Sequence, residues 1–121
     1  MFLLKYNYFY MKLLYKNRKL EKSVASLSVI AATYGTRAKL VNQRKNELQA
    51  APTLETMRTI IGANCHELKG NLKGKLAVTI SGNHRLIFEP ANDPISTKED
   101  GGLDWKRVVE ITIIDIGEDY H

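Results

Sequence analysis

Apolar residues recur at intervals of three and four positions in the first third of the chain, as on one face of a helix. This stripe consists of Leu20, Val24, Leu27, Ala31 and Tyr34. Gly35 follows the stripe, at the place where a left-handed glycine commonly ends a helix. The pattern therefore predicts one helix from about residue 20 to residue 34.

A second helix is predicted directly after Gly35. Thr36 is expected to be its N-cap, because a hydroxyl can accept from a free backbone N–H, and Pro52 ends it. The apolar positions expected to face inward are Ala38, Leu40, Val41 and Leu48. The basic positions expected to face outward are Arg37, Lys39, Arg44 and Lys45. A short helical turn is expected to follow, from about Leu54 to Ile61.

After residue 70 the apolar period changes to strict alternation, which is typical of a strand. Leu76, Val78 and Ile80 share one face, and Ala77 and Thr79 share the other. The turn residues 81–83 lead into a partner strand at 84–89, so the pair is predicted to be a β-hairpin.

A polar, acidic loop at 91–104 separates this hairpin from a last β-rich strand at 108–116. An N-terminal strand is expected before the first helix. The resulting fold class is α+β, with an antiparallel sheet packed on two helices. At 121 residues and 44% hydrophobic, the chain is expected to form a single domain, 1–121.

The segment 1–15 is rich in aromatic residues, which raises the question of a targeting signal. It is interrupted by Asn7, is too short to span a bilayer and has no small-residue cleavage site. Residues 1–10 are therefore interpreted as an atypical aromatic extension, and no membrane partner is expected. Because the single cysteine, Cys65, cannot form an intramolecular disulfide, the expected location is the cytoplasm.

Charge is segregated along the chain. Residues 1–85 hold 15 Lys and Arg against 4 Asp and Glu, whereas residues 86–121 hold 3 against 9. Such a basic body suits a polyanion such as RNA, although solvated basic helices are equally compatible with it. The acidic loop is expected to stay away from RNA phosphates.

Several kinds of site are disfavoured by residue spacing. Cys65 and His66 are adjacent, which usually points the two side chains apart, so a thiolate–imidazole pair is disfavoured. The cysteine and the three histidines match no zinc-site spacing, and 70–74 is no phosphate loop. No metal and no cofactor are expected.

One basic cluster could carry metal-free RNA cleavage. It surrounds the predicted hairpin and consists of His66, Lys69, Lys73, Lys75 and Arg85. Cleavage needs a base for the ribose 2′-proton, cations for the charge on the phosphorane and an acid for the leaving oxygen. The residues alone leave a second interpretation open, in which these are solvated hairpin charges.

Three strings of sequence resemble the HigB branch of the RelE toxin family. They are the block 66–74 (HELKGNLKG) with Leu76-Ala77-Val78, the returning segment 82–88 (GNHRLIF), and the ending Asp119-Tyr120-His121. Residues 15–20 also resemble the family's first strand and helix. The resemblance extends over nearly the whole chain from Met11.

The resemblance implies a RelE-like fold and a toxin of a type II toxin–antitoxin system that cleaves mRNA in the ribosomal decoding site. The implied partners are the ribosome with its mRNA and a HigA-like helix-turn-helix antitoxin, through which alone the toxin would contact operator DNA. As a hypothesis, we assign His121 as the general base, His66 as the acid or orienter, and Lys69 and Arg85 as the residues that stabilise the phosphate. Tyr120 would stack on a base and Asp119 would orient a neighbour.

Further basic residues are expected to hold RNA as general charges. They are Lys73, Lys75, Arg37, Lys39, Arg44 and Lys45. Two alternatives share the fold, namely a ParE-like gyrase inhibitor and an inactive member that acts only with its antitoxin in autoregulation.

Overall fold

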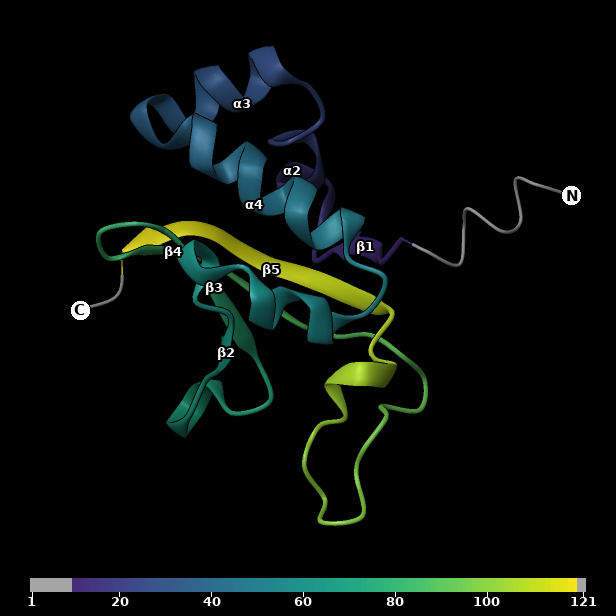
Figure 1. Ribbon diagram of the computed structural model, residues 1–121. Coiled ribbons are helices and arrows are strands. Elements are labelled where there is room, and N and C mark those ends of the chain that lie inside the picture. Colours follow the sequence, from purple (N-terminus) through teal and green to yellow (C-terminus); the bar gives the residue numbers. More distant parts are fainter. Residues whose placement is uncertain (1–9, 120–121) are drawn as a thin grey trace, which may run out of the picture.

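The computed structural model describes residues 10–119, in which helices cover one face of a five-stranded sheet (Figure 1). The strand order across the sheet is β1-β5-β4-β3-β2. The strands are β1 (Lys12–Tyr15), β2 (His66–Glu67), β3 (Leu76–Ser81), β4 (His84–Pro90) and β5 (Glu110–Asp119). The predicted α+β class, hairpin and last strand are therefore confirmed.

The region predicted as one first helix contains two. These are α2 (Arg18–Lys22) and α3 (Leu27–Tyr34). Ser23 donates its hydroxyl to the Leu20 carbonyl at 2.6 Å, and Ser26 accepts from the Val29 N–H at 3.3 Å as the N-cap of α3. Serine side chains compete for backbone groups in this way and stop one helix while they start the next.

The second predicted helix is α4 (Ala38–Ala50), which follows the 3-10 turn η1 (Gly35–Arg37). The residue before it is Arg37, with no side-chain cap, so the prediction of Thr36 as N-cap was wrong. The other 3-10 turns are η2 (Leu54–Thr59), η3 (Ile61–Ala63), η4 (Gly70–Leu72) and η5 (Trp105–Arg107).

The sheet is not antiparallel throughout. β1 pairs with β5 in parallel, in a register that sets Leu13 opposite Ile111, whereas the three other pairings are antiparallel. A parallel neighbour requires a long crossover, and here the chain between β1 and β5 supplies it through the helices and the β2–β4 strands. The expectation of a wholly antiparallel sheet was wrong at this edge.

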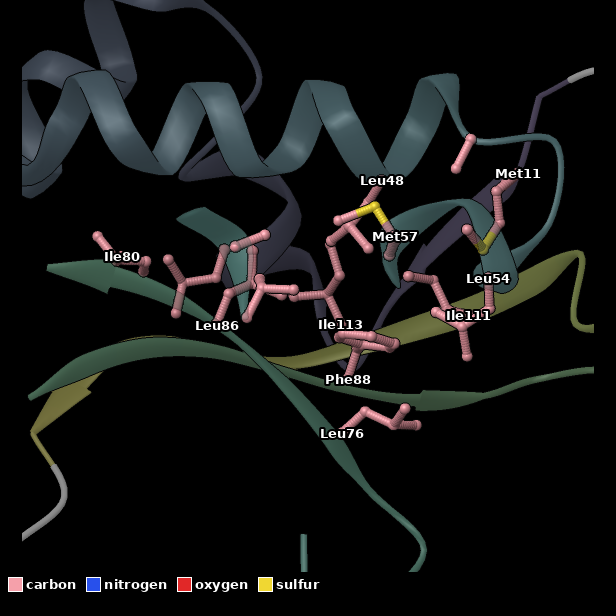
Figure 2. Packing of buried hydrophobic residues seen from close by; sticks show 14 of the residues in the cluster. Met11, Leu48, Leu54, Met57, Leu76, Ile80, Leu86, Phe88, Ile111 and Ile113 are labelled. Carbon is pink, nitrogen blue, oxygen red and sulfur yellow. The ribbon is translucent and has the colours of Figure 1, made fainter. Parts of the chain in front are cut away.

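The hydrophobic core lies between the sheet and α4 (Figure 2). Leu48 from α4, Met57 from η2, and Phe88 and Ile113 from the sheet are all fully buried. Leu76, Val78 and Ile80 belong to the same core, as their alternation predicted. Ala77, Thr79 and their neighbours across the strands therefore lie on the sheet face that turns away from the helices. We call it the open face, although Ala77 and its neighbour Ile87 on it are fully buried.

Two arms extend from the sheet away from the helices (Figure 1). One arm is residues 66–76, from β2 through η4 to β3. The other is the acidic loop 91–104, which folds into a narrow hairpin because the Lys98 N–H donates to Gly102 O at 2.7 Å and Asp104 N–H donates to Ser96 O at 3.0 Å. The two arms flank a common space.

Candidate active site

His66 and Arg85 lie on the open face of the sheet. His66 of β2 is opposite Ala77, and Arg85 of β4 is opposite Thr79, two residues further along β3. Strand spacing places their Cα atoms about 10 Å apart across the strands and about 7 Å along them.

The ring of His66 is held by the backbone. Its Nδ1 lies 2.8 Å from the carbonyl oxygen of Asn64, a residue in the left-handed region with φ of 46°. A carbonyl only accepts, so Nδ1 carries a proton, and Nε2 is the nitrogen left for a substrate. His66 is exposed, so a large ligand can reach that nitrogen.

Cys65 precedes His66 but does not form a nucleophilic pair with it. Burial raises the pKa of the Cys65 thiol to about 12, and the nearby Arg58 offsets only part of this effect. The thiol is therefore protonated at neutral pH, whereas a cysteine nucleophile must be a thiolate.

The end of β5 lies beside the turn of the β3–β4 hairpin. Asp119 is opposite His84 and Glu118 is opposite Arg85, after a bulge at Gly117, whose φ is +78°. A left-handed glycine is the usual residue at such a bulge, which bends the strand. The first residue of the predicted terminal triplet is thus next to the Arg85 strand, while Tyr120 and His121 lie outside the described residues.

Lys69 and Lys73 are not on the open face with His66. Both line a pocket between the two arms, together with Leu76 and Pro90 from the core side of their strands. Lys75 lies nearer the sheet and forms an ion pair with Glu89, with 3.7 Å between Nζ and the carboxylate. The structure therefore places His66 and Arg85 on one face of the sheet, whereas Lys69 and Lys73 line the pocket between the arms.

Arg44 was predicted to face outward and hold RNA, and this prediction was wrong. Its side chain is 6% exposed, and the guanidinium donates to Thr79 O at 2.6 Å, to Gly62 O at 2.8 Å and to Glu47 at 2.9 Å. The hydrogen bonds of the guanidinium are therefore made within the fold. Arg44 ties α4 to β3 and η3.

The other three basic residues of this region differ in environment. Lys39 is exposed, and Lys45 is half-buried with Nζ 3.3 Å from the Val24 carbonyl. Arg37 lies over the end of β5, where a Cβ on Gly117 would be 3.8 Å from its Nε. Lys39 is therefore the most open of the three to a polyanion.

Two contacts near the site were absent from the sequence-based expectations. Trp105 of η5 donates its indole N–H to Glu67 at 2.9 Å, and the Arg58 guanidinium lies 3.8 Å from the centre of the indole ring. These contacts hold the base of the acidic loop against β2. The two-residue strand β2 was too short for an alternating pattern to reveal it.

Within residues 10–119, no group of three or more His, Cys, Asp or Glu side chains is arranged to hold a metal ion. None of the helices in this part of the chain is long and apolar enough to cross a membrane.

No protein-family model matches the sequence, and no curated protein matches it. Among solved structures, the chain is similar to the YoeB/ParE toxin from Agrobacterium tumefaciens, with 14% sequence identity over 91% of this chain and 100% of that chain and a TM-score of 0.52. The YoeB dimer from Staphylococcus aureus is also similar, with 15% identity over 91% and 98% of the two chains and a TM-score of 0.49.

The first of these similarities shows that the chain has the fold of a YoeB/ParE toxin, as the RelE-like expectation required. The finer assignment to the HigB branch stays a prediction, carried by the sequence strings alone.

Proposed function

We propose that the chain is the toxin of a type II toxin–antitoxin system and that it cleaves mRNA on the ribosome without a metal. The observation that carries the proposal is the fixed imidazole of His66 on the same open face as Arg85, with the end of β5 beside Arg85. The similarity in fold to a YoeB/ParE toxin supports it.

In the proposed reaction, the ribose 2′-oxygen attacks the adjacent phosphorus in line with the leaving 5′-oxygen. The P–O5′ bond breaks, which leaves a 2′,3′-cyclic phosphate on one product and a 5′-hydroxyl on the other. His121 takes the 2′-proton, and Arg85 stabilises the charge on the phosphorane. Tyr120 stacks on a base and Asp119 orients a neighbouring side chain.

His66 acts as the acid in this scheme. Asn64 O accepts from Nδ1 whether or not the ring is charged, so the hydrogen bond of 2.8 Å also suits the imidazolium. The protonated Nε2 then gives its proton to the leaving 5′-oxygen. Lys69, which lines the pocket between the two arms, contacts a neighbouring phosphate.

The proposed partners follow from the same function. They are the ribosomal decoding site with its mRNA, and a HigA-like helix-turn-helix antitoxin that mediates any contact with operator DNA. The basic residues Lys39 and Lys45 on α4, with Arg37 and Lys75, would contribute general attraction to RNA. The proposed site of action is the cytoplasm.

Induction of the chain in a bacterium tests the proposal. We expect arrest of growth with mRNA cut inside codons, and purified ribosomes carrying a defined mRNA should give the same cuts with cyclic phosphate ends. Arg85→Ala should slow this cleavage, whereas its matched control Lys98→Ala, which alters an exposed lysine of the acidic loop, should not. DNA damage with intact mRNA would instead identify a gyrase inhibitor and refute the nuclease.

A further inference from the structure

The two arms enclose a pocket of about 470 Å³ that is distinct from the open face. Its walls are largely apolar, with Leu68 and Leu76 from the first arm and Ile95 and Leu103 from the acidic loop. Lys69 and Lys73 also line it, and both are exposed. The pocket thus combines an apolar interior with two ammonium groups.

This combination suits a ligand that has a flat, mostly apolar body and an attached anion. Pockets of roughly 300 to 1,000 Å³ bury ligands of the size of a nucleotide or a drug. Lysines act as point charges for phosphate, and aliphatic walls exclude water from both faces of a ring.

We propose that the pocket binds one unpaired nucleotide of the RNA, adjacent to the nucleotide whose phosphate is cleaved. The base lies between Leu68 and the Ile95–Leu103 side of the acidic loop, and its phosphate contacts Lys69 and Lys73. This inference rests on the proposed ribonuclease function and assigns a subsite to its substrate.

The acidic loop does not oppose this ligand. Two of its carboxylates form ion pairs, Asp100 with Lys98 and Asp104 with Arg107, and none of the loop's acidic residues lines the pocket. The one acidic residue that lines the pocket, Glu67, accepts the hydrogen bond from Trp105. Two lysines and one carboxylate therefore line the pocket, so the side chains that a ligand meets carry a net positive charge.

The pocket also adjoins the proposed reaction site along the chain, since its lining begins at Glu67, the residue after His66. His66 and Lys69 are three residues apart on one arm, a separation of about 10 Å for extended chain. β2 is the edge strand of the sheet, so a single strand of RNA can pass over it from the open face to the pocket. A nucleotide that enters the pocket would hold the next phosphodiester near His66.

Titration of the full chain with the four nucleoside 5′-monophosphates, followed by amide NMR, tests the pocket without requiring cleavage. We expect the amide chemical shifts of Lys69, Lys73, Ile95 and Leu103 to change. The indole N–H signal of Trp105, the only tryptophan in the sequence, should change as well. Inorganic phosphate should shift the lysines but not the apolar wall.

Paired variants sharpen the test. Ile95→Asp places a carboxylate in the pocket wall at a residue that is 53% exposed, so the fold should persist while nucleotide affinity falls by about tenfold or more. Ile61→Asp is the matched control, since Ile61 is 93% exposed and does not line the pocket. Lys73→Ala should weaken binding and Lys98→Ala should not.

The proposed subsite would be refuted if nucleotides changed the chemical shifts of other residues only, or if Ile95→Asp left the affinity for nucleotides unchanged. Pocket shifts caused by an acidic, apolar peptide but by no nucleotide would also overturn it and identify a protein-docking site. Nucleotide binding without ribosomal cleavage would refute the nuclease alone, whereas cleavage without nucleotide binding would refute the pocket alone.

Discussion

Arg44 of α4 donates from its Nε to the carbonyl oxygen of Thr79 in β3, at 2.6 Å, across the boundary between the helices and the sheet. The same guanidinium donates to Gly62 O, so two backbone carbonyls depend on one side chain. A residue that the charge pattern assigned to RNA is therefore a structural link.

Arg44→Met should lower the free energy of unfolding by about 3 kcal/mol, because it leaves buried carbonyls and Glu47 without their donor. Urea denaturation measures the effect. Lys39→Ala, on the exposed side of the same helix, should change stability by at most about 0.5 kcal/mol. If Arg44→Met kept full stability and lost only affinity for ribosomes, the structural role would be refuted.

His66→Gln should lower the rate of ribosome-dependent cleavage by about 10² to 10⁴, the usual contribution of a general acid. Its stability should stay near that of the wild type because His66 is exposed. Single-turnover cleavage of mRNA on ribosomes measures the rate. Wild-type rates in this variant would exclude His66 from proton transfer.

His84→Gln is the control for this experiment, since His84 is a half-buried residue beside the hairpin turn and has no role in the proposed reaction. It should cleave at close to the wild-type rate.

Cys65 should make stability depend on pH above pH 9. Burial raises the pKa of its thiol from 9.0 to about 12, so the folded protein holds this proton more tightly than the unfolded chain does. The resulting contribution is fully present below pH 9 and is lost as the pH rises towards 12, at about 1.4 kcal/mol per pH unit. The difference between wild type and Cys65→Ala in urea denaturation at pH 8 and pH 10 isolates it. An equal difference at both pH values would contradict the shift.

Trp105→Ala should destabilise the chain by about 3 to 5 kcal/mol, because it removes a large buried side chain along with the Glu67 hydrogen bond and the Arg58 contact. Trp105→Phe, which keeps a ring but loses the N–H, should cost much less. Thermal unfolding of the two variants compares them. Equal losses would mean that the hydrogen bond dominates over packing.

The candidate site was only partly predictable. The sequence strings singled out His66 and Arg85, and the register of the sheet places both on one face. They could not reveal that Lys69, three residues after His66, lines a different pocket, because the position of an arm depends on what packs against it. Here that partner is the acidic loop, which was expected to keep away from RNA.

Arg44 shows the limit of the helical pattern in another way. It lies three residues after Val41 and four before Leu48, both fully buried, so its spacing marks the inner face of α4. The charge of Arg44 predicted that its side chain is exposed to solvent, whereas its spacing from Val41 and Leu48 predicted that it faces the core. Spacing was correct, because carbonyls from β3 and η3 satisfy the guanidinium there.

What the sequence determined by itself is local: the alternation of β3, the turn to β4, the stripe of α4 and the motif around His66. These follow from the period of side chains along a strand or helix, which neighbours in the chain decide. Only the tertiary structure decided the parallel pairing of β1 with β5, the burial of Arg44 and the position of Lys69 in a pocket against the acidic loop. Each of these joins segments far apart in sequence, whose contacts depend on how the layers pack together.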